Sequence, residues 1–187
     1  MSLLLSLDPG RQGLGWAAFR DGKLVAAGVV KQPKGPRDYE QASLQEVADN
    51  ARTEILRTVQ GLTMLLPSPF RSCVVERMTS YPGKGQYAAN DLLDLQAIGG
   101  MVAGALCPLA GISWLRPQEW KGSVDTEILA GKLGTWLSPE ELAICAVAEK
   151  KHKKRWHNAV DAIHLAGKHL RRWSVQSGRV SISNGQR

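Results

Sequence analysis

Short apolar runs separated by turn residues make up the first part of the chain. The run Ser2–Leu7 leads directly into Asp8-Pro9-Gly10, which is the pattern of a buried strand closed by a turn. Gly15–Phe19 and Lys23–Val30 are two further strand-like runs, and the Asp-Gly pair between them is a strong hairpin signal. The chain therefore opens with three consecutive strands, which we expect to form an antiparallel meander.

From Tyr39 onward the apolar positions change to a helical spacing. They predict one long amphipathic helix over Tyr39–Leu66 and a second helix over Gln86–Cys107. Between these helices, Arg71–Glu76 has the pattern of a buried strand that ends in an acid. After the second helix, Gly111–Leu115 is expected to form a fifth strand that is also buried.

The last part of the chain is predicted to be mainly helical, with a short helix around Thr126–Leu133. Ser138 is followed by a proline and two acids, which supply an N-cap, a first helical position and an acidic first turn. A helix should therefore run from there to about Glu149. Lys150–Arg155 is interpreted as a basic loop, and Trp156–Trp173 as the final helix.

Together these elements predict an α/β fold in one domain over residues 1–173, with a five-stranded mixed sheet flanked by helices. The polar segment 174–187 is expected to be a mobile tail. Ile98–Leu115 carries no formal charge, but Pro108 and four glycines interrupt it. We interpret this stretch as a core helix, a turn and a buried strand rather than as a membrane span.

The composition is that of a soluble globular protein with an excess of positive charge. The 187 residues include 24 lysines and arginines against 17 acids, so the net charge is +7. This balance favours a polyanionic partner but does not determine the fold. Cys73, Cys107 and Cys145 form no CxxC pair, which argues against a disulfide framework and against a zinc site. With no secretory signal at the amino terminus, we expect a cytoplasmic protein.

Three acids interrupt the apolar pattern at positions where a charge is costly. Asp8 and Glu76 end two apolar runs, and Asp161 lies inside an otherwise apolar helical face. Each acid alone has an ordinary explanation, namely a solvated strand end or a hydrogen-bonded core aspartate. Adjacent strands that end on one side, with a helix that delivers a third acid, would instead form an anionic pocket. Oxygen-rich pockets prefer Mg²⁺ or Mn²⁺, and two such ions assist phosphodiester cleavage.

Three segments of the chain resemble the motifs of RuvC-type Holliday-junction resolvases. They are Leu3–Trp16 (LLLSLDPGRQGLGW), Val74-Val75-Glu76 and His157–Ala166 (HNAVDAIHLA). The resemblance extends from about Leu3 to Leu170, and it implies a ribonuclease H-like fold. It also implies that Asp8, Glu76 and Asp161 are catalytic residues that bind metal, with Mg²⁺ or Mn²⁺ as the cofactor and two ions in each active site.

The fourth metal position departs from the family pattern. Typical bacterial members have an aspartate or a histidine three residues before the last aspartate, where this chain has Asn158. His157 stands one residue earlier and on the same helical side as Asp161. We favour His157 as a catalytic residue that binds the metal or activates water, with Asn158 as the alternative fourth ligand.

Several basic and aromatic residues near these motifs are candidates for DNA contacts. The segment Lys150–Arg155 precedes the catalytic helix, the loop 77–86 follows Glu76, and two further cations flank Trp120. All have ordinary alternatives, because charge runs are often solvated and a loop tyrosine often packs on a sheet edge. The candidate DNA-binding residues are Arg77, Tyr81, Lys84, Arg116, Lys121, Lys150, Lys151, Lys153, Lys154 and Arg155.

The resemblance therefore implies a metal-dependent endonuclease that resolves four-way or otherwise branched DNA. Symmetric cutting of a junction requires two active sites, so a homodimer is expected, with the glycine-rich helix Gln86–Cys107 contributing to its interface. The short chain and the variant last motif resemble phage-borne relatives, so the host is a bacterial or phage-infected cell. Two alternatives stay open: a ribonuclease H-like enzyme that acts on RNA or an RNA–DNA hybrid, and a catalytically inactive DNA-binding module.

Overall fold

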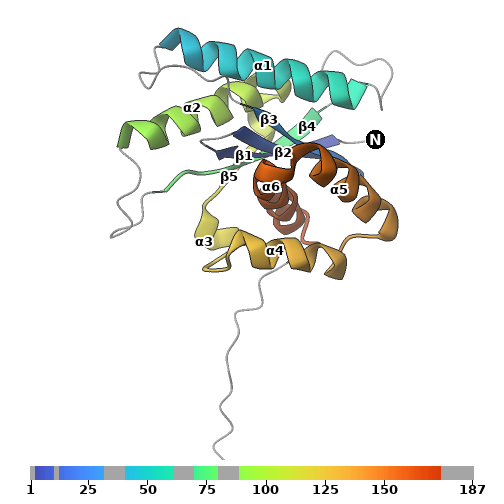
Figure 1. Ribbon diagram of the computed structural model, residues 1–187. Coiled ribbons are helices and arrows are strands. Elements are labelled where there is room, and N and C mark those ends of the chain that lie inside the picture. The colour runs from blue at the N-terminus through green and yellow to red at the C-terminus, as the bar shows by residue number, and fades with distance from the viewer. Residues whose placement is uncertain (1–2, 11–12, 32–40, 61–69, 80–88, 174–187) are drawn as a thin grey trace, which may run out of the picture.

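A five-stranded mixed sheet forms the centre of the computed structural model (Figure 1). The structure describes residues 3–10, 13–31, 41–60, 70–79 and 89–173. The strands follow the order β3-β2-β1-β4-β5 across the sheet. β1 (Leu3–Gly10), β2 (Gly13–Arg20) and β3 (Lys23–Lys31) form the predicted antiparallel meander, whereas β4 (Phe70–Glu76) and β5 (Ile112–Leu115) continue parallel to β1. The predicted α/β architecture is confirmed.

Helices cover both faces of this sheet (Figure 1). α1 (Gln41–Gln60) and α2 (Ala89–Leu106) pack on one face of the sheet. Their apolar side chains form one core with Leu3, Leu5 and Leu7 of β1. The other face is covered by the helices α4 (Thr126–Lys132), α5 (Pro139–His152) and α6 (Trp156–His169). Because side chains alternate along a strand, Asp8 lies on the same side of β1 as Leu4, which packs with α6.

Two strand predictions are wrong in detail. We expected a turn at Asp8-Pro9-Gly10, but β1 continues through these residues and pairs Asp8 with Gly15 of β2. The ladder to β4 ends at Leu7, so Pro9 has a strand neighbour on one side only, which a residue without an amide hydrogen tolerates. We also expected a buried fifth strand, but β5 is an edge strand whose Trp114 is exposed.

The helices also differ from their predicted bounds. Lys150–Arg155 is not a loop, because Lys150–His152 form the last turn of α5 and Lys153–Arg155 form a 3₁₀ turn, η3. Cations in a last helical turn interact favourably with the helix dipole. α6 ends at His169 rather than at Trp173, since Arg171 takes a left-handed conformation with φ of 56°.

A few elements complete the chain. The short helix α3 (Pro117–Trp120) was not predicted, and two further 3₁₀ turns lie at η1 (Leu109–Gly111) and η2 (Leu133–Thr135). The stretch Ile98–Leu115 is divided among α2, η1 and β5, as expected. In the described part of the chain, no helix is long and apolar enough to span a bilayer. The ends of the long helix predicted over Tyr39–Leu66 and the tail 174–187 lie outside the described residues.

A buried ion pair joins the segment that follows α6 to the start of α5. Glu141 is 3% exposed and accepts hydrogen bonds from both terminal nitrogens of Arg172, at 2.7 and 2.8 Å. It also accepts from the backbone amides of Leu24 at 2.6 Å and Ser138 at 2.9 Å. Burial alone would raise the pKa of Glu141, but the hydrogen bonds from Arg172, Ser138 and Leu24 lower it to about 2.

Replacing Glu141 by glutamine should destabilise the protein in a pH-dependent way. The loss at neutral pH should be about 2–3 kcal/mol of unfolding free energy, because Arg172 keeps its charge without a partner. The folded pKa lies below the ordinary 4.5. The contribution of the carboxylate is therefore complete above about pH 5, and it disappears as the pH falls toward its folded pKa.

Urea unfolding at several pH values measures this effect for the wild type and for Glu141→Gln. Glu149→Gln, an exposed glutamate on the same helix, is the matched control and should change stability little. A difference between wild type and Glu141→Gln that stays constant from neutral pH down to pH 3 would contradict the assignment.

Candidate metal centre

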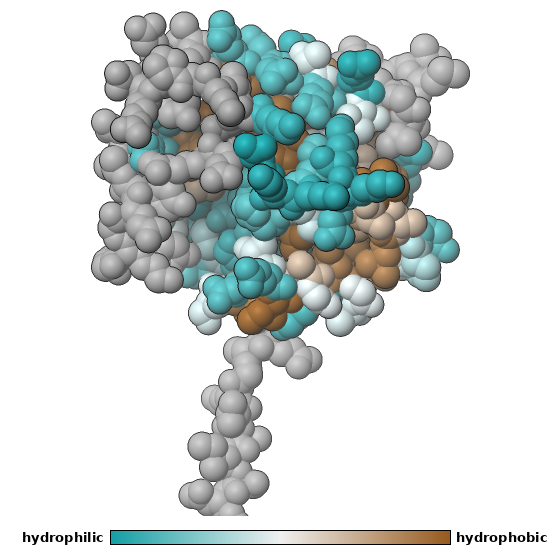
Figure 2. Space-filling model, viewed as in Figure 1, coloured by the Kyte–Doolittle hydropathy of each residue, from teal (hydrophilic) through white to brown (hydrophobic). Residues whose placement is uncertain are grey.

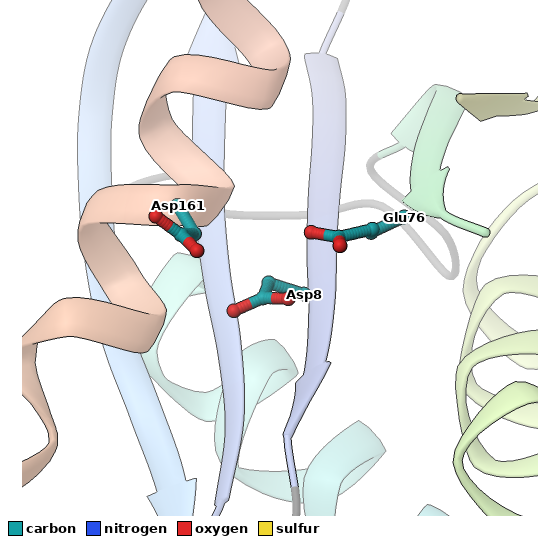
Figure 3. Close-up of side chains that lie close together, drawn as sticks. All are labelled: Asp8, Glu76 and Asp161. Atoms are coloured by element: carbon teal, nitrogen blue, oxygen red, sulfur yellow. The ribbon is translucent and has the colours of Figure 1, made fainter. Parts of the chain in front are cut away.

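Three carboxylates from three separate elements meet at one end of the sheet (Figure 3). Asp8 lies on β1, Glu76 ends β4, and Asp161 lies on α6, with exposed fractions of 8, 6 and 6%. One oxygen of each lies within 4.8 Å of the others. The parallel register explains part of this, because Leu7 pairs with Val75 and the next residue of each strand is an acid. The acids that the sequence singled out are therefore brought together.

Glycines in the first motif allow α6 to lie against the sheet and deliver Asp161. Gly15 pairs with Asp8 across the β1–β2 ladder, and a Cβ at Gly15 would lie 2.1 Å from the carbonyl oxygen of Asn158. The side-chain amide of Asn158 donates to the carbonyl of Gly13 at 2.8 Å. A larger residue at position 15 would push the helix away from the sheet. This close approach sets Asp161, less than one turn later, beside Asp8.

A lysine from outside the predicted acid group completes the cluster. The Lys121 ammonium donates to Asp161 Oδ2 at 2.7 Å, and Thr126 Oγ1 donates to the same oxygen at 3.1 Å. Lys121 also lies over the ring of Trp120, with 4.7 Å from Nζ to the ring centroid. The ammonium reaches Asp161 because the short helix α3 buries Trp120 and turns the chain toward α6. The DNA-backbone contact expected of Lys121 stays a prediction.

The single positive charge of Lys121 neutralises the three carboxyl groups only in part. Burial raises the pKa of Asp8 well above its ordinary value, and repulsion from Glu76 and Asp161 raises it further. Burial also raises the pKa of Glu76, although Lys121 partly opposes this. Burial would lower the pKa of Lys121, but the three acids together raise it. One ammonium therefore faces three carboxyl groups, and the group as a whole favours additional positive charge.

The donor atoms fit a small, hard cation. Asp161 Oδ1 and Glu76 Oε2 are buried and have no hydrogen-bond partner among the described residues. Buried polar atoms without a protein partner usually bind water, an ion or a ligand. Carboxylate oxygens without sulfur or imidazole donors are the set that Mg²⁺ and Mn²⁺ prefer. Asp8, Glu76 and Asp161 could therefore hold such an ion.

The two candidates for the fourth ligand lie at the start of α6, and the identity of that ligand stays a prediction. His157 is exposed at the start of α6, and the group of possible ligand atoms in the described residues does not include it. Its position one turn before Asp161 places it at the solvent-exposed beginning of the helix. Asn158 is buried, and its amide nitrogen donates to the carbonyl of Gly13. This hydrogen bond docks α6 on the meander, and it uses the amide nitrogen rather than the amide oxygen that a metal would bind.

The remaining predicted DNA contacts lie mainly on the surface. Arg77 is exposed, and Arg116 forms an exposed ion pair with Glu119 at 3.2 Å. In the basic segment, Lys151 lies 3.7 Å from Glu54, and Arg155 is half-buried. The exposed residues of that segment without a described ion pair are Lys150, Lys153 and Lys154. Tyr81 and Lys84 lie outside the described residues.

Sequence reasoning missed the contacts of Lys121 and Thr126 with Asp161. A helix of four residues such as α3 is too short to show a periodic pattern, so nothing in the sequence placed Lys121 inside the protein. The sequence pattern also did not single out His164. This side chain is fully buried, and its Nε2 lies 2.9 Å from the Leu129 carbonyl oxygen. Burial lowers the pKa of His164 to about 4, so this histidine is a neutral core residue at physiological pH.

Comparison with known proteins supports the fold. No protein-family model matches the sequence, and no curated protein matches it. Among solved structures, RuvC of T. thermophilus in complex with a Holliday junction substrate is similar, with a TM-score of 0.52 and 17% sequence identity. The similarity covers 90% of this chain and 92% of that chain. A second Thermus thermophilus RuvC structure has a TM-score of 0.44 at 18% identity, over 90% of this chain and 97% of that one.

At this level of identity the likeness establishes the fold alone. It confirms the predicted ribonuclease H-like arrangement, a mixed sheet with helices on both faces, of the kind that RuvC has. The chain is thus an α/β protein with a RuvC-like fold and a buried acidic cluster.

Replacing Asp8 by asparagine should stabilise the metal-free protein while removing its response to metal. The change takes one repelling charge out of the buried group, so the free energy of unfolding should rise by about 1 kcal/mol in EDTA. For the wild type, Mg²⁺ at a hundredfold excess over its dissociation constant should add about 2.7 kcal/mol. Asp8→Asn should lose most of this gain.

Thermal unfolding with EDTA and with Mg²⁺ tests both expectations without measuring activity. The matched control is Asp125→Asn, because Asp125 is exposed at the start of α4. A wild-type midpoint that does not respond to Mg²⁺ or Mn²⁺ would rule out the proposed ion site.

Proposed function

We propose that this protein is a divalent-metal-dependent endonuclease that cuts four-way or otherwise branched DNA. The observation that carries the proposal is the buried group of Asp8, Glu76 and Asp161, with oxygens within 4.8 Å of one another. A RuvC-like fold around this group supports it, because the similar structure is a RuvC in complex with a Holliday junction substrate. The net charge of +7 is suited to a polyanionic substrate.

In the proposed mechanism, Asp8, Glu76 and Asp161 would hold Mg²⁺ or Mn²⁺, with two ions in each active site. When bound, such ions supply Lewis-acid stabilisation and lower the pKa of water for in-line displacement at phosphorus. Thr126 orients Asp161 through its hydroxyl, at 3.1 Å from Oδ2. Lys121 neutralises part of the acid group and presents a positive charge beside the place where a phosphate would lie. His157, exposed one turn before Asp161, is proposed to orient water at the rim.

The basic segment is proposed to hold the phosphates that flank the cut. Lys150, Lys153 and Lys154 are exposed and lie immediately before α6 in the chain. The amino terminus of a helix adds positive potential of its own. Arg155 is half-buried, and its Cδ lies 3.5 Å from the position of a Cβ on Gly13, so it is held against the meander. Arg77 and Arg116 are proposed as further backbone contacts.

We propose a homodimer, whose interface is an apolar surface on α2, η1 and β5. Leu93, Leu109 and Trp114 are 66, 81 and 38% exposed. A Cβ on Gly100 would lie 3.8 Å from the Trp114 ring, and one on Gly104 would lie 4.0 Å from Leu109. The small residues Gly100 and Gly104 of α2 therefore lie beside the exposed Trp114 and Leu109, and exposed large apolar groups of this kind often mark an interface. Two copies are also what paired cuts require.

The wider context of the activity is proposed from the same features. Residues 1–173 would act as a single nuclease domain, because the sheet and α6 jointly build one site. The asparagine that replaces the usual acid or histidine of the last motif supports a phage-type member of the resolvase family. Three buried cysteines without disulfides are consistent with a reducing compartment such as the cytoplasm of the bacterial or phage-infected cell.

The chain should nick a synthetic four-way DNA junction symmetrically in the presence of Mg²⁺ or Mn²⁺. Asp8→Asn should lower the rate by at least about a hundredfold, because one of the three carboxylates that would hold the metal is lost. His157→Ala and Asn158→Ala, made separately, test the fourth position. Product mapping on sequencing gels locates the nicks in the two opposed strands.

The controls for this experiment separate the alternatives. Linear duplex DNA and an RNA–DNA hybrid should be cut much more slowly than the junction, and a preference for the hybrid would favour the ribonuclease alternative. Light scattering at micromolar protein should give a dimer, and Leu109→Glu should shift it toward monomer. No cleavage of any substrate with either metal would contradict the proposed activity.

Neutralising Lys150, Lys153 and Lys154 together should flatten the salt dependence of junction binding. Each lost phosphate contact should reduce the slope of log Kobs against log salt by about 0.9. The measurement is fluorescence anisotropy of a labelled junction in Ca²⁺ with the Asp8→Asn background, from low to moderate salt. Lys132→Ala on α4 is the control for a general loss of positive charge. An unchanged slope for the triple variant would show that these lysines do not contact phosphate.

A further inference from the structure

A groove of about 490 Å³ runs along an edge of the sheet, on the side away from β4 and β5. β3 and Trp16 form its floor, and α1 and α5 form its walls. β3 is the terminal strand of the described sheet, and β2 separates it from the strand that carries Asp8. The groove is therefore distinct from the proposed metal centre. The Leu24 amide near the start of β3 is already bonded to Glu141, so an added strand would pair with the part of this edge that follows it.

The two walls of the groove differ in chemistry. The α5 wall is apolar, with Ile144 and Val147 in the groove and Val147 72% exposed. Figure 2 shows hydrophobic surface gathered on the side of the molecule where α5 lies, bordered by hydrophilic residues. The α1 wall contributes the polar residues Glu54 and Thr58. Side chains of a strand added to β3 would point alternately to these two walls, so an apolar–polar alternation fits the groove.

One end of the groove is positively charged. Lys151 supplies this charge beside His152; burial lowers the pKa of His152 and favours its neutral form, and the nearby cations Lys151 and Lys31 lower it further. Glu54 is the single acid of the lining and is already 3.7 Å from Lys151. Lys23 and Lys31 stand at the two ends of β3, so antiparallel pairing of two β3 strands would place like charges opposite each other. The charges favour an acidic ligand over a second copy of this chain.

The same end contains a buried donor without a partner. Trp16 is 2% exposed, and its indole nitrogen has no hydrogen-bond partner among the described residues. A Cβ on Gly28 would lie 3.2 Å from this nitrogen and 3.3 Å from His152 Nε2. Gly28 thus leaves a notch between an indole N–H and an imidazole nitrogen, with Lys151 lining the same groove. An acceptor oxygen placed there would satisfy the indole donor.

We propose that this groove binds an extended acidic segment of a partner protein as an additional strand on β3. Main-chain hydrogen bonds to the edge of β3 provide affinity, and the two walls provide the specificity. Apolar side chains of the segment face Ile144 and Val147, and polar side chains face α1. A carboxylate at one end of the segment accepts from Trp16 and pairs with Lys151. The proposal does not depend on the nuclease activity.

The probe is a fluorescein-labelled peptide that alternates valine with threonine and carries aspartates at one end. Fluorescence anisotropy with the full chain should show saturable binding, and a peptide with lysines in place of the aspartates should bind at least about tenfold more weakly. Val147→Asp should weaken binding of the aspartate peptide about tenfold, because it places a charge in the apolar wall. Ile128→Asp, at an exposed apolar position on α4, should leave binding unchanged.

Two further measurements identify the mode of binding. Hydrogen exchange should slow in β3 when the peptide is added, as expected for a new strand at this edge. Trp16→Phe keeps the ring but removes the donor, so it should reduce the preference for aspartate over asparagine in the peptide by several fold. Junction cleavage should be unaffected by Val147→Asp. Absence of saturable binding, equal affinity for the lysine peptide, or no effect of Val147→Asp would each overturn the proposal.

Discussion

The burial of three carboxylates in one small volume is the constraint on which the rest of this structure depends. Such a group opposes its own folding, because each charge loses hydration and repels the other two. Lys121 offsets part of this repulsion through its contact with Asp161, while burial, and then repulsion from Glu76 and Asp161, raise the pKa of Asp8. Bound cations would supply the missing positive charge, which is the physical basis of the proposed metal site.

The packing around the acids explains how the chain can hold them together. α6 approaches β2 so closely that only glycine fits at position 15, and the side-chain amide of Asn158 donates to Gly13 at the start of β2. On the opposite face, α2 packs against the neighbouring strand β1, where a Cβ on Gly99 would lie 2.8 Å from Pro9. β1 is therefore held from both sides at the position of Asp8. The ion pair of Glu141 with Arg172 secures the segment that follows α6 to α5.

The sheet also separates the surfaces on which different partners are proposed to bind. The acids lie where β1, β4 and α6 meet, the apolar patch of α2 and β5 lies at one edge, and the groove along β3 lies at the other. A dimer through the first edge would leave the second edge accessible in both copies. α5 connects two of these surfaces, because its apolar side lines the groove and its last turn carries the cations proposed to contact phosphate.

Local patterns in the sequence were sufficient for the order of strands and main helices and for the three acids, because alternation, helical spacing and misplaced charges are all local properties. The resemblance to RuvC-type motifs added the fold, which the structure bears out.

Tertiary structure alone decided the rest. Pro9 can stay in a strand because β4 stops pairing earlier, and β5 is exposed because it is an edge strand. Lys121 and Asp161 are 40 residues apart and meet through packing of α3 on α6, and Asn158 docks the helix while His157 faces solvent. Such long-range choices depend on which surfaces become neighbours, and no local pattern records that.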